Sequence, residues 1–379
     1  MRRFRSFLGL LLFSACLTIG CSKQGPRTST PTDVTKDDKD KVVNLYIWAD
    51  DIAPDTLSSF EKLTGIKVQV SYFDSPETLE SRMLTGNSGF DVVVPTAAFI
   101  QRHIRSGAYL DLDKNRLPNL GNLDPAIMSR VARNDPGNTH GIVYTWGTFG
   151  IGYNKAMVSK ALPDPPLDSW RLVFDPAVAS KLAKSGINLM DDPVGVVRVV
   201  LILLGRDSNA PTSQDLTDVE QALAKIRPFI RNIDTSSQIQ ALANGDLCVA
   251  LAYNGNVVQA QKRAKEAENG TEIDYVIPKE GTLLWFDLLA IPRDAPHVAS
   301  AHLFINYLMD PHVIANISNA IGYANANVAA TPLLDPSIAA DPAIYPTPDQ
   351  MSRLMVQVQL SPEQVRAITR IWQKFKTGQ

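Results

Sequence analysis

The fold class is decided by the stretch VVNLYIW, residues 42–48, whose β-branched and aromatic residues predict a strand. A helical pattern follows Pro54 and stops at Gly65, because glycine readily adopts the left-handed backbone that ends a helix. A second strand-like run covers residues 67–73. The chain therefore opens with a strand, a helix and a strand.

The same alternation continues beyond the second strand. Ser75 and Pro76 are the residue types that helices prefer at the N-cap and the first helical position, and this helix runs to about Thr85. Residues 91–95 form a short apolar run of the kind that is buried on both faces of a parallel sheet, and a further helix starts at Ala97. Strands that alternate with helices are typical of the α/β class.

The middle of the chain predicts a second α/β region. The glycines at 147, 150 and 152 mark a change of region, and helical segments dominate from about 176 to 204. Later strands are expected near residues 231–234, 247–253 and 283–291. With 379 residues, 45% of them apolar, the chain has enough material for two domains of ordinary size.

Residues 1–20 are predicted to be an export signal peptide. Arginines near the N-terminus precede an apolar run, residues 7–17, which is shorter than the roughly 20 residues of a spanning helix. The run ends near Cys21 in a pattern similar to a bacterial lipobox, so Cys21 is the predicted lipidation site. A plain cleaved signal is the alternative, and Cys16 would be a poorer lipidation site; both alternatives still export the protein.

Residues 21–41 are predicted to be a flexible tether, because Ser, Thr, Pro, Asp and Lys without apolar residues cannot form a core. Once the signal arginines are removed, the 39 acidic residues outnumber the basic ones, and nothing favours contact with nucleic acid. Of the three cysteines, Cys16 would be removed and Cys21 acylated. Only Cys248 would then remain, which excludes a disulfide within the chain.

The sequence contains no motif for catalysis, a metal or a cofactor. The histidines show no metal-ligand spacing, and we interpret them as surface or capping residues: His103, His140, His297, His302 and His312. The glycines at 147–152 lack the third glycine of a dinucleotide loop, and neither a phosphate loop nor a nucleophile elbow is present. We therefore expect a binding protein without metal or cofactor, not an enzyme.

Aromatic and acidic residues gather where the predicted strands end. Trp48 is followed by Asp50 and Asp51, and Thr96 follows the third strand. In an open α/β sheet these loops face one crevice. An indole face attracts an ammonium group by roughly 0.5–2 kcal/mol, and a carboxylate accepts its hydrogen bonds. The alternatives are that Trp48 is a core residue and that the two aspartates form a solvated turn.

Similar pairings recur later in the chain. Tyr253 and Asn256 follow an apolar strand, and Tyr323 lies in a loop of small polar residues. Asp287 is the most informative of these residues, because it follows Trp285 in an apolar run that is predicted to be buried. A buried charge is costly unless it is paired. Its partner is either a ligand cation or an internal Arg or Lys, and the pattern leaves both open.

From Val42 to the C-terminus, the chain resembles the periplasmic polyamine-binding proteins of ABC importers. The resemblance is carried by IAPDT at 52–56, FEKLTGIKV at 60–68, GFDVVVP at 89–95, GIGYN at 150–154, LANGD at 242–246, PKEG at 278–281 and YANAN at 323–327. It implies the type II periplasmic-binding-protein fold, in which two lobes are joined by a hinge that the chain crosses more than once. The expected lobes are 42–146 with 266–313, and 147–265 with 314–379.

The resemblance also implies a function and a site. It implies capture of a polyamine such as putrescine, between aromatic rings and carboxylates, by an exported, lipid-anchored periplasmic monomer that hands it to an ABC permease. Residues placed in this site are Trp48, Asp50, Asp51, Thr96, Ser236, Tyr253, Asn256, Trp285, Asp287 and Tyr323.

Several positions depart from the family pattern. Ala49 and Asp51 replace a serine and a tyrosine, Gly195 replaces an acidic residue, and Asn256 replaces an aspartate that holds the second ammonium group. The loss of one carboxylate would weaken diamine binding about ten- to a hundredfold. A different cationic or aminated metabolite is therefore an alternative ligand.

The family's second cysteine corresponds to Ser185 in this chain, so we expect Cys248 to be a free, buried thiol. Two alternative functions stay open beside import. The protein could be a sensor that presents its closed form to a signalling receptor, or an exported enzyme.

Overall fold

The computed structural model describes residues 41–49 and 51–378. The predicted signal peptide, Cys21, nearly all of the predicted tether and Asp50 lie outside the described residues. The described strands are β1 Val42–Trp48, β2 Lys67–Phe73, β3 Val92–Val93, β4 Gly141–Asn154, β5 Ile187–Leu189, β6 Ile230–Ile233, β7 Val249–Tyr253, β8 Ile273–Val276, β9 Thr282–Ala290 and β10 Leu354–Val356.

The α-helices of the described residues lie between and around these strands. They are α1 Thr56–Thr64, α2 Pro76–Thr85, α3 Ala97–Arg105, α4 Pro125–Val131, α5 Lys155–Ala161, α6 Arg171–Phe174, α7 Pro176–Leu182, α8 Pro193–Leu203, α9 Ser213–Ile226, α10 Gln238–Asn244, α11 Asn254–Glu266, α12 Val298–Leu308, α13 Pro311–Ile321, α14 Pro336–Ala339, α15 Pro348–Ser352 and α16 Pro362–Thr377.

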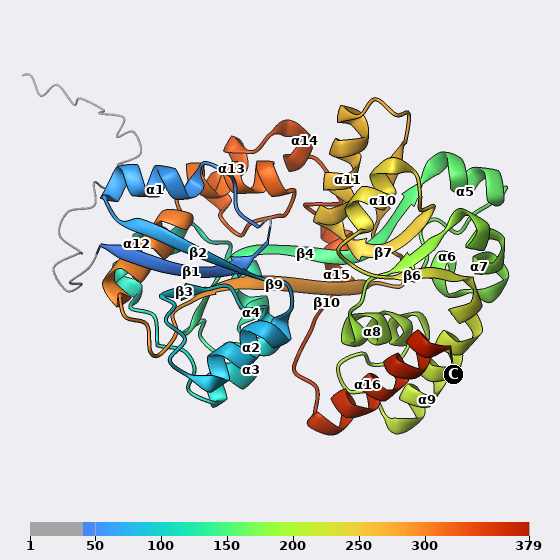
Figure 1. Ribbon diagram of the computed structural model, residues 1–379, viewed down its shortest axis with the longest axis horizontal. Coiled ribbons are helices and arrows are strands. Elements are labelled where there is room, and N and C mark those ends of the chain that lie inside the picture. The colour runs from blue at the N-terminus through green and yellow to red at the C-terminus, as the bar shows by residue number, and fades with distance from the viewer. Residues whose placement is uncertain (1–40, 50, 379) are drawn as a thin grey trace, which may run out of the picture. The chain divides into compact units, whose positions relative to one another are not determined.

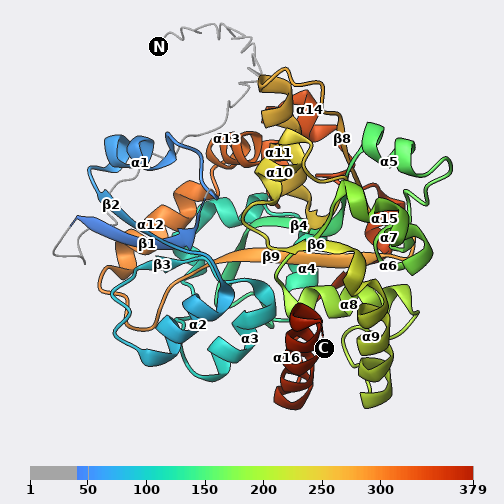
Figure 2. The same ribbon diagram turned by 45° about the vertical axis from the view of Figure 1, so that its right-hand side comes forward.

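The strands form one mixed sheet in the order β2-β1-β3-β9-β4-β7-β5-β6, with β8 paired to β4 and β10 to β9. Both ends of this order are parallel: β1 pairs with β2 and β3, and β5 pairs with β6 and β7. We call β1–β3 the first parallel group and β5–β7 the second. The antiparallel strands β4 and β9 lie between them, and helices flank each group (Figures 1 and 2). The α/β prediction is confirmed.

The first parallel group follows the sequence prediction closely. β1 and β2 have the predicted bounds, and Gly65 ends α1 with a φ of 70°. The hydroxyl of Ser75 caps α2 by accepting a hydrogen bond of 3.2 Å from the backbone N–H of Thr78. Local residue chemistry is therefore sufficient to specify this part of the fold.

The glycine run at 147–152 lies within β4, and all fourteen residues of this strand are buried. β4 pairs with β9 as far as Thr148 and with β7 from Phe149 onward, so the run marks the place where the strand changes partners. Glycine is needed because side chains cross the strand here: a Cβ on Gly150 would lie 2.3 Å from the ring of Tyr275. The predicted lobe boundary at residues 146/147 falls just before this change and stays a prediction.

Helical segments dominate residues 176–204 as predicted, although the short buried strand β5 separates α7 from α8. One sequence interpretation needs correction. His103 and His302 are buried and are not surface residues. Burial lowers the pKa of His103 to about 4, and its Nδ1 lies 2.9 Å from the hydroxyl of Tyr109, so this histidine is a neutral core residue. None of the described helices is both long and apolar enough to cross a membrane.

Candidate ligand-binding site

The carboxylate of Asp287 is the centre of the candidate site. Asp287 lies on β9 opposite Thr145 of β4, and its Oδ1 accepts a hydrogen bond of 2.8 Å from Oγ1 of Thr96. Its side chain is buried, and burial raises the pKa to about 7, although Thr96 and the indole of Trp48 lower it. No Arg or Lys of the described chain forms an ion pair with Asp287. The alternative of an internal cationic partner is therefore wrong.

Three polar atoms near Asp287 are buried without a hydrogen-bond partner. They are Nε1 of Trp48, Nε1 of Trp285 and Oγ1 of Thr145. The indole N–H of Trp48 acts on the pKa of Asp287, yet it does not reach hydrogen-bonding geometry with the carboxylate. The Trp48 ring packs on Phe73 with centroids 4.4 Å apart, so it belongs partly to the core. Because buried polar atoms are normally paired, this arrangement suits a polar ligand.

Four aromatic side chains form a continuous row beside this carboxylate. Ring centroids lie 5.0 Å apart for Phe149 and Tyr253, 5.9 Å for Tyr253 and Trp285, and 4.8 Å for Trp285 and Tyr323. Each pair meets edge to face, which is a favourable geometry for aromatic rings. We call Phe149, Tyr253, Trp285 and Tyr323 the aromatic row. The structure brings the three predicted members together and adds Phe149.

Two glycines allow the aromatic row to form. A Cβ on Gly147 would lie 2.5 Å from the ring of Trp285, and a Cβ on Gly255 would lie 2.1 Å from the ring of Tyr323. Any larger residue would displace these rings. Sequence reasoning missed both positions, although the glycine-rich run that contains Gly147 was visible as an unusual feature.

A bulge in β4 connects Asp51 to the site. The register of β4 against β9 shifts between Val143 and Thr145, and the hydroxyl of the intervening Tyr144 donates a hydrogen bond of 2.7 Å to the backbone carbonyl of Asp51. Bulges commonly redirect a side chain in this way. Asp51 is 7% exposed, so the alternative of a solvated turn is wrong for this residue.

The charges of Asp51 and Asp287 act on the same tyrosines. Burial raises the pKa of Tyr144 well above its usual value, and the two carboxylates raise it further. The same holds for Tyr323, on which Asp51, Tyr253 and Asp287 act in addition to burial. The charges of both carboxylates therefore reach Tyr144 and Tyr323. Asp50, the other predicted acid of this loop, lies outside the described residues.

Asn256 and Ser236 differ in their relation to the site. Oδ1 of Asn256 accepts a hydrogen bond of 3.2 Å from the hydroxyl of Tyr323, which places Asn256 at the aromatic row. Ser236 is exposed, and its hydroxyl donates a hydrogen bond of 2.9 Å to Asp234. In the part of the chain that the structure describes, Ser236 makes no hydrogen bond to the other predicted site residues.

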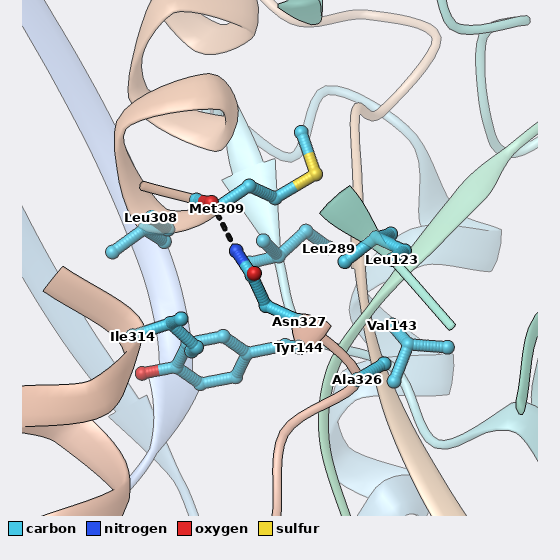
Figure 3. A pocket seen from close by; sticks show the side chains of 9 residues that line it. All are labelled: Leu123, Val143, Tyr144, Leu289, Leu308, Met309, Ile314, Ala326 and Asn327. Carbon is cyan, nitrogen blue, oxygen red and sulfur yellow. Dashed lines mark hydrogen bonds between the residues drawn. The ribbon is translucent and has the colours of Figure 1, made fainter. Parts of the chain in front are cut away.

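Two small pockets, each with a volume of about 10 Å³, are lined by residues that include Tyr144 in one and Thr96 in the other. The first is mostly apolar and is shown in Figure 3; it is lined by Leu123, Val143, Tyr144, Leu289, Leu308, Met309, Ile314, Ala326 and Asn327. The second lies against Thr96 and Trp285. Each has room for about one water molecule, which is too little for a polyamine.

Among residues 41–49 and 51–378, no group of three or more His, Cys, Asp and Glu side chains is arranged to bind a metal ion. Cys248 is free and buried, as predicted, and burial raises the pKa of its thiol to about 12. This thiol is therefore protonated and unreactive at neutral pH.

Fold and site together define a two-lobed α/β binding protein with aromatic walls and a buried acid. Residues 56–347 match the family described as bacterial extracellular solute-binding protein, and the chain belongs to this family. The expectation of a binding protein, not an enzyme, agrees with this membership.

Relatives with known names support the resemblance to polyamine-binding proteins. The chain is 44% identical to the putrescine-binding periplasmic protein SpuD of Pseudomonas aeruginosa, over 89% of this chain and 92% of the relative. It is also 44% identical to the putrescine-binding periplasmic protein PotF of Escherichia coli, with the same coverage.

Solved structures show the same fold. A structure described as a spermidine/putrescine ABC transporter from Listeria monocytogenes has a TM-score of 0.79 and 31% identity, over 89% of this chain and 100% of that one. PotD from Streptococcus pneumoniae, described as a spermidine/putrescine substrate-binding protein, has a TM-score of 0.76 and 27% identity, over 89% and 99%. The predicted two-lobed fold is confirmed.

Proposed function

We propose that this protein captures a polyamine of the putrescine class in the periplasm and delivers it to the permease of an ABC importer. The observation that carries the proposal is Asp287, a buried carboxylate without an internal cation, beside two unpaired indole N–H groups. An ammonium group would form a charge-assisted hydrogen bond to Asp287 and lie against the rings. The names of the most similar relatives, which are putrescine-binding proteins, support this assignment.

Binding would close the two lobes, with no bond made or broken. Trp48 ends β1 of the first parallel group and Thr96 follows β3. Tyr253 ends β7 of the second group, and Asp287 lies on β9 between the two groups. A ligand that contacts all four residues stabilises the closed arrangement relative to an open one. We propose that the lobes comprise 42–146 with 266–313, and 147–265 with 314–379; small-angle scattering with and without ligand tests the closure.

Isothermal titration calorimetry tests the ligand class. Putrescine, cadaverine, spermidine, agmatine and basic amino acids form the panel, and glutamate is the anionic control. We expect at least one aliphatic amine to bind with a dissociation constant in the micromolar range or below, about −8 kcal/mol. Absence of binding heat for every cation would overturn the amine assignment.

A second candidate ligand is a monoamine or another aminated metabolite. Asn256, which accepts a hydrogen bond from Tyr323, and Gly195 both lack the charge that a second ammonium group would favour. Tighter binding of butylamine than of putrescine would identify the protein as a monoamine binder.

We also propose that the protein is a monomer attached to the membrane through Cys21 alone. The lipobox-like sequence before Cys21 and the periplasmic location named for the relatives support this proposal. Metabolic labelling with palmitate should label the wild-type chain and not a Cys21→Ala variant. Label on both proteins would contradict the anchor, and a dimer mass in light scattering would contradict the monomer.

A further inference from the structure

The change of partners within β4 leaves Thr148 without a backbone partner on the β7 side. β4 pairs with β7 from Phe149 opposite Tyr253 onward, so the next residue in this register, opposite Thr148, is Asn254. Asn254 does not continue β7, because it is the first residue of α11. Thr148 is 1% exposed, and a buried N–H without a partner costs about 1–3 kcal/mol. The strand therefore needs a side chain at this position.

Side chains pair with both backbone groups of Thr148. Oδ1 of Asn254 accepts a hydrogen bond of 3.1 Å from the backbone N–H of Thr148. The hydroxyl of Tyr275, on β8, donates a hydrogen bond of 3.1 Å to the backbone carbonyl of Thr148 and lies 2.7 Å from its Oγ1. We call Thr148 with the side chains of Asn254 and Tyr275 the Thr148 joint. At this one position of β4, side chains take the place of a strand.

Both polar atoms of the Asn254 side chain have partners within the protein. Asn254 is fully buried, and its Nδ2 donates a hydrogen bond of 3.0 Å to the backbone carbonyl of Ala343. Ala343 lies two residues before Tyr345, whose ring packs on Trp146 of β4 with centroids 6.1 Å apart. One side chain thus connects the start of α11, the strand β4 and the segment around Ala343.

The carboxamide of Asn254 also lies beside a ring of the aromatic row. A Cβ on Gly147 would lie 2.2 Å from Oδ1 of Asn254 and 2.5 Å from the ring of Trp285. Gly147 of β4 is the residue opposite Trp285 of β9, so both side chains occupy the space over this glycine. The indole ring therefore has Asn254 as a neighbour in addition to Tyr253 and Tyr323.

The residues that flank Asn254 contact the aromatic row as well. Tyr253 is itself a member of the row, and a Cβ on Gly255 would lie 2.1 Å from the ring of Tyr323. Oδ1 of Asn256 accepts the hydrogen bond from the hydroxyl of the same tyrosine. A movement of Asn254 away from β4 would therefore displace Tyr253 and the residues that hold Tyr323.

We propose that Asn254 is a positioning residue of the ligand site. Through its hydrogen bonds to Thr148 and Ala343, it holds three rings of the aromatic row where an amine contacts them: Tyr253, Trp285 and Tyr323. This assignment rests on the proposed function. Because the polar atoms of Asn254 are used within the protein, its loss should weaken the binding of every amine by the same factor.

The test measures putrescine and butylamine affinities of purified Asn254→Ala by calorimetry. This variant leaves the N–H of Thr148 unpaired and opens space beside Trp285. We expect both amines to bind about tenfold more weakly, as for one lost hydrogen bond, with an unchanged ratio of the two affinities. Tyr275→Phe removes the other hydrogen bond of the Thr148 joint and should cause a smaller loss. Because both changes act at one residue of β4, their effects on affinity should not be additive in the double variant.

Asn188→Ala is the matched control. Asn188 of β5 is also fully buried and paired within the protein, since its Nδ2 donates to the carbonyl of Asp234 and its Oδ1 accepts from Gln238. We expect this variant to lower the melting temperature and to leave amine affinity unchanged. A measurement without ligand separates positioning from stability. The indole N–H resonance of Trp285, assigned by its loss in Trp285→Phe, should shift in Asn254→Ala and not in Asn188→Ala.

An unaltered amine affinity in Asn254→Ala, an equal loss in Asn188→Ala or an unshifted Trp285 resonance overturns the assignment while the proposed function stands. If Asn254→Ala does not fold, Tyr275→Phe decides in its place, and unaltered affinity and resonance there overturn the assignment. Failure of the wild type to bind any amine overturns the proposed function itself, and the Trp285 resonance then decides by itself whether Asn254 positions the ring.

Discussion

Asp287 and Asn254 are both buried polar residues of one site, but they are paired differently. Asp287 lies on a central strand, is enclosed by side chains and accepts a hydrogen bond from a single hydroxyl, that of Thr96. Asn254 uses both ends of its carboxamide within the protein, toward Thr148 and Ala343. Burial raises the pKa of Asp287 to about 7, whereas the carboxamide carries no charge.

This difference separates two tasks within one site. A buried carboxylate with little internal support gains most from a cation, because that cation replaces the solvation lost on burial. A carboxamide whose donor and acceptor are both paired gains little from a ligand and fixes the groups around it. We therefore expect Asp287 to decide whether an amine binds, and Asn254 to decide how well the rings are placed for it.

The largest effect should come from Asp287→Asn. Loss of a buried carboxylate leaves the ammonium group unpaired, which costs about 3–5 kcal/mol, so putrescine and butylamine should both bind at least about 100-fold more weakly by calorimetry. A loss confined to putrescine would contradict this prediction, because both amines carry the ammonium group that Asp287 is expected to bind.

The same variant should stabilise the ligand-free protein. Unfolded aspartate has a pKa of about 3.9, so native Asp287 with its pKa of about 7 holds a proton that the unfolded chain has released between pH 4 and 7. The free energy of unfolding therefore falls as pH rises through this window and stays low above pH 7. Thermal melts at pH 8 should show Asp287→Asn several degrees above the wild type.

The next largest effect is the pH dependence of binding. Below pH 7 an incoming ammonium group must displace the proton on Asp287, so butylamine affinity should fall about tenfold per pH unit, with little change above pH 7. Butylamine isolates the contact with Asp287, because it lacks a second charge. Titrations at pH 5.5, 6.5 and 8 in buffers of different ionisation enthalpy count the protons released. Equal affinity at all three pH values would contradict the raised pKa.

Asn256→Asp should have the opposite sign. An aspartate there would still accept the hydrogen bond from Tyr323 and would add a charge to the row, so we expect putrescine to bind about tenfold more tightly. Asn256→Leu, which removes the acceptor, is the comparison variant. If the aspartate has no effect on any amine, position 256 does not contact the ligand.

The smallest predicted effect is that of Tyr144→Phe. This change removes the hydrogen bond to the carbonyl of Asp51, which is worth about 1 kcal/mol, and the peptide of Asp51 loses its support. Both amines should therefore bind roughly fivefold more weakly in the same titration. A lower affinity for putrescine with an unchanged affinity for butylamine would contradict this prediction, because both amines are expected to use Asp287.

Much of the fold was predictable because its signals are local. The strand at 42–48, the glycine that ends α1 and the cap at Ser75 depend on neighbouring residues, and the structure confirms all three. The strands β5, β8 and β10 were not predicted. They have three or four residues each and form because longer strands lie beside them, which no local pattern reveals.

The site was predictable to a smaller extent, because only some of its residues are marked by a local pattern in the sequence. The acid in an apolar run singled out Asp287, and the ends of the first and third strands predicted that Trp48 and Thr96 face one crevice. Phe149 was missed, because it reads as an ordinary core residue. The part that Asn254 plays depends on Thr148, which lies 106 residues away in the chain, and only the pairing of β4 with β7 brings the two together.

The strand β4 has a consequence for how the molecule unfolds. Its first half pairs with β9, which pairs with β3 of the first parallel group, and its second half pairs with β8 and with β7 of the second group, so β4 and β9 together link the two groups. The sheet is therefore one cooperative unit, unlike two domains joined by a linker, and calorimetry should show a single melting transition. A shift of that one transition by a ligand reports on both halves of the molecule at once.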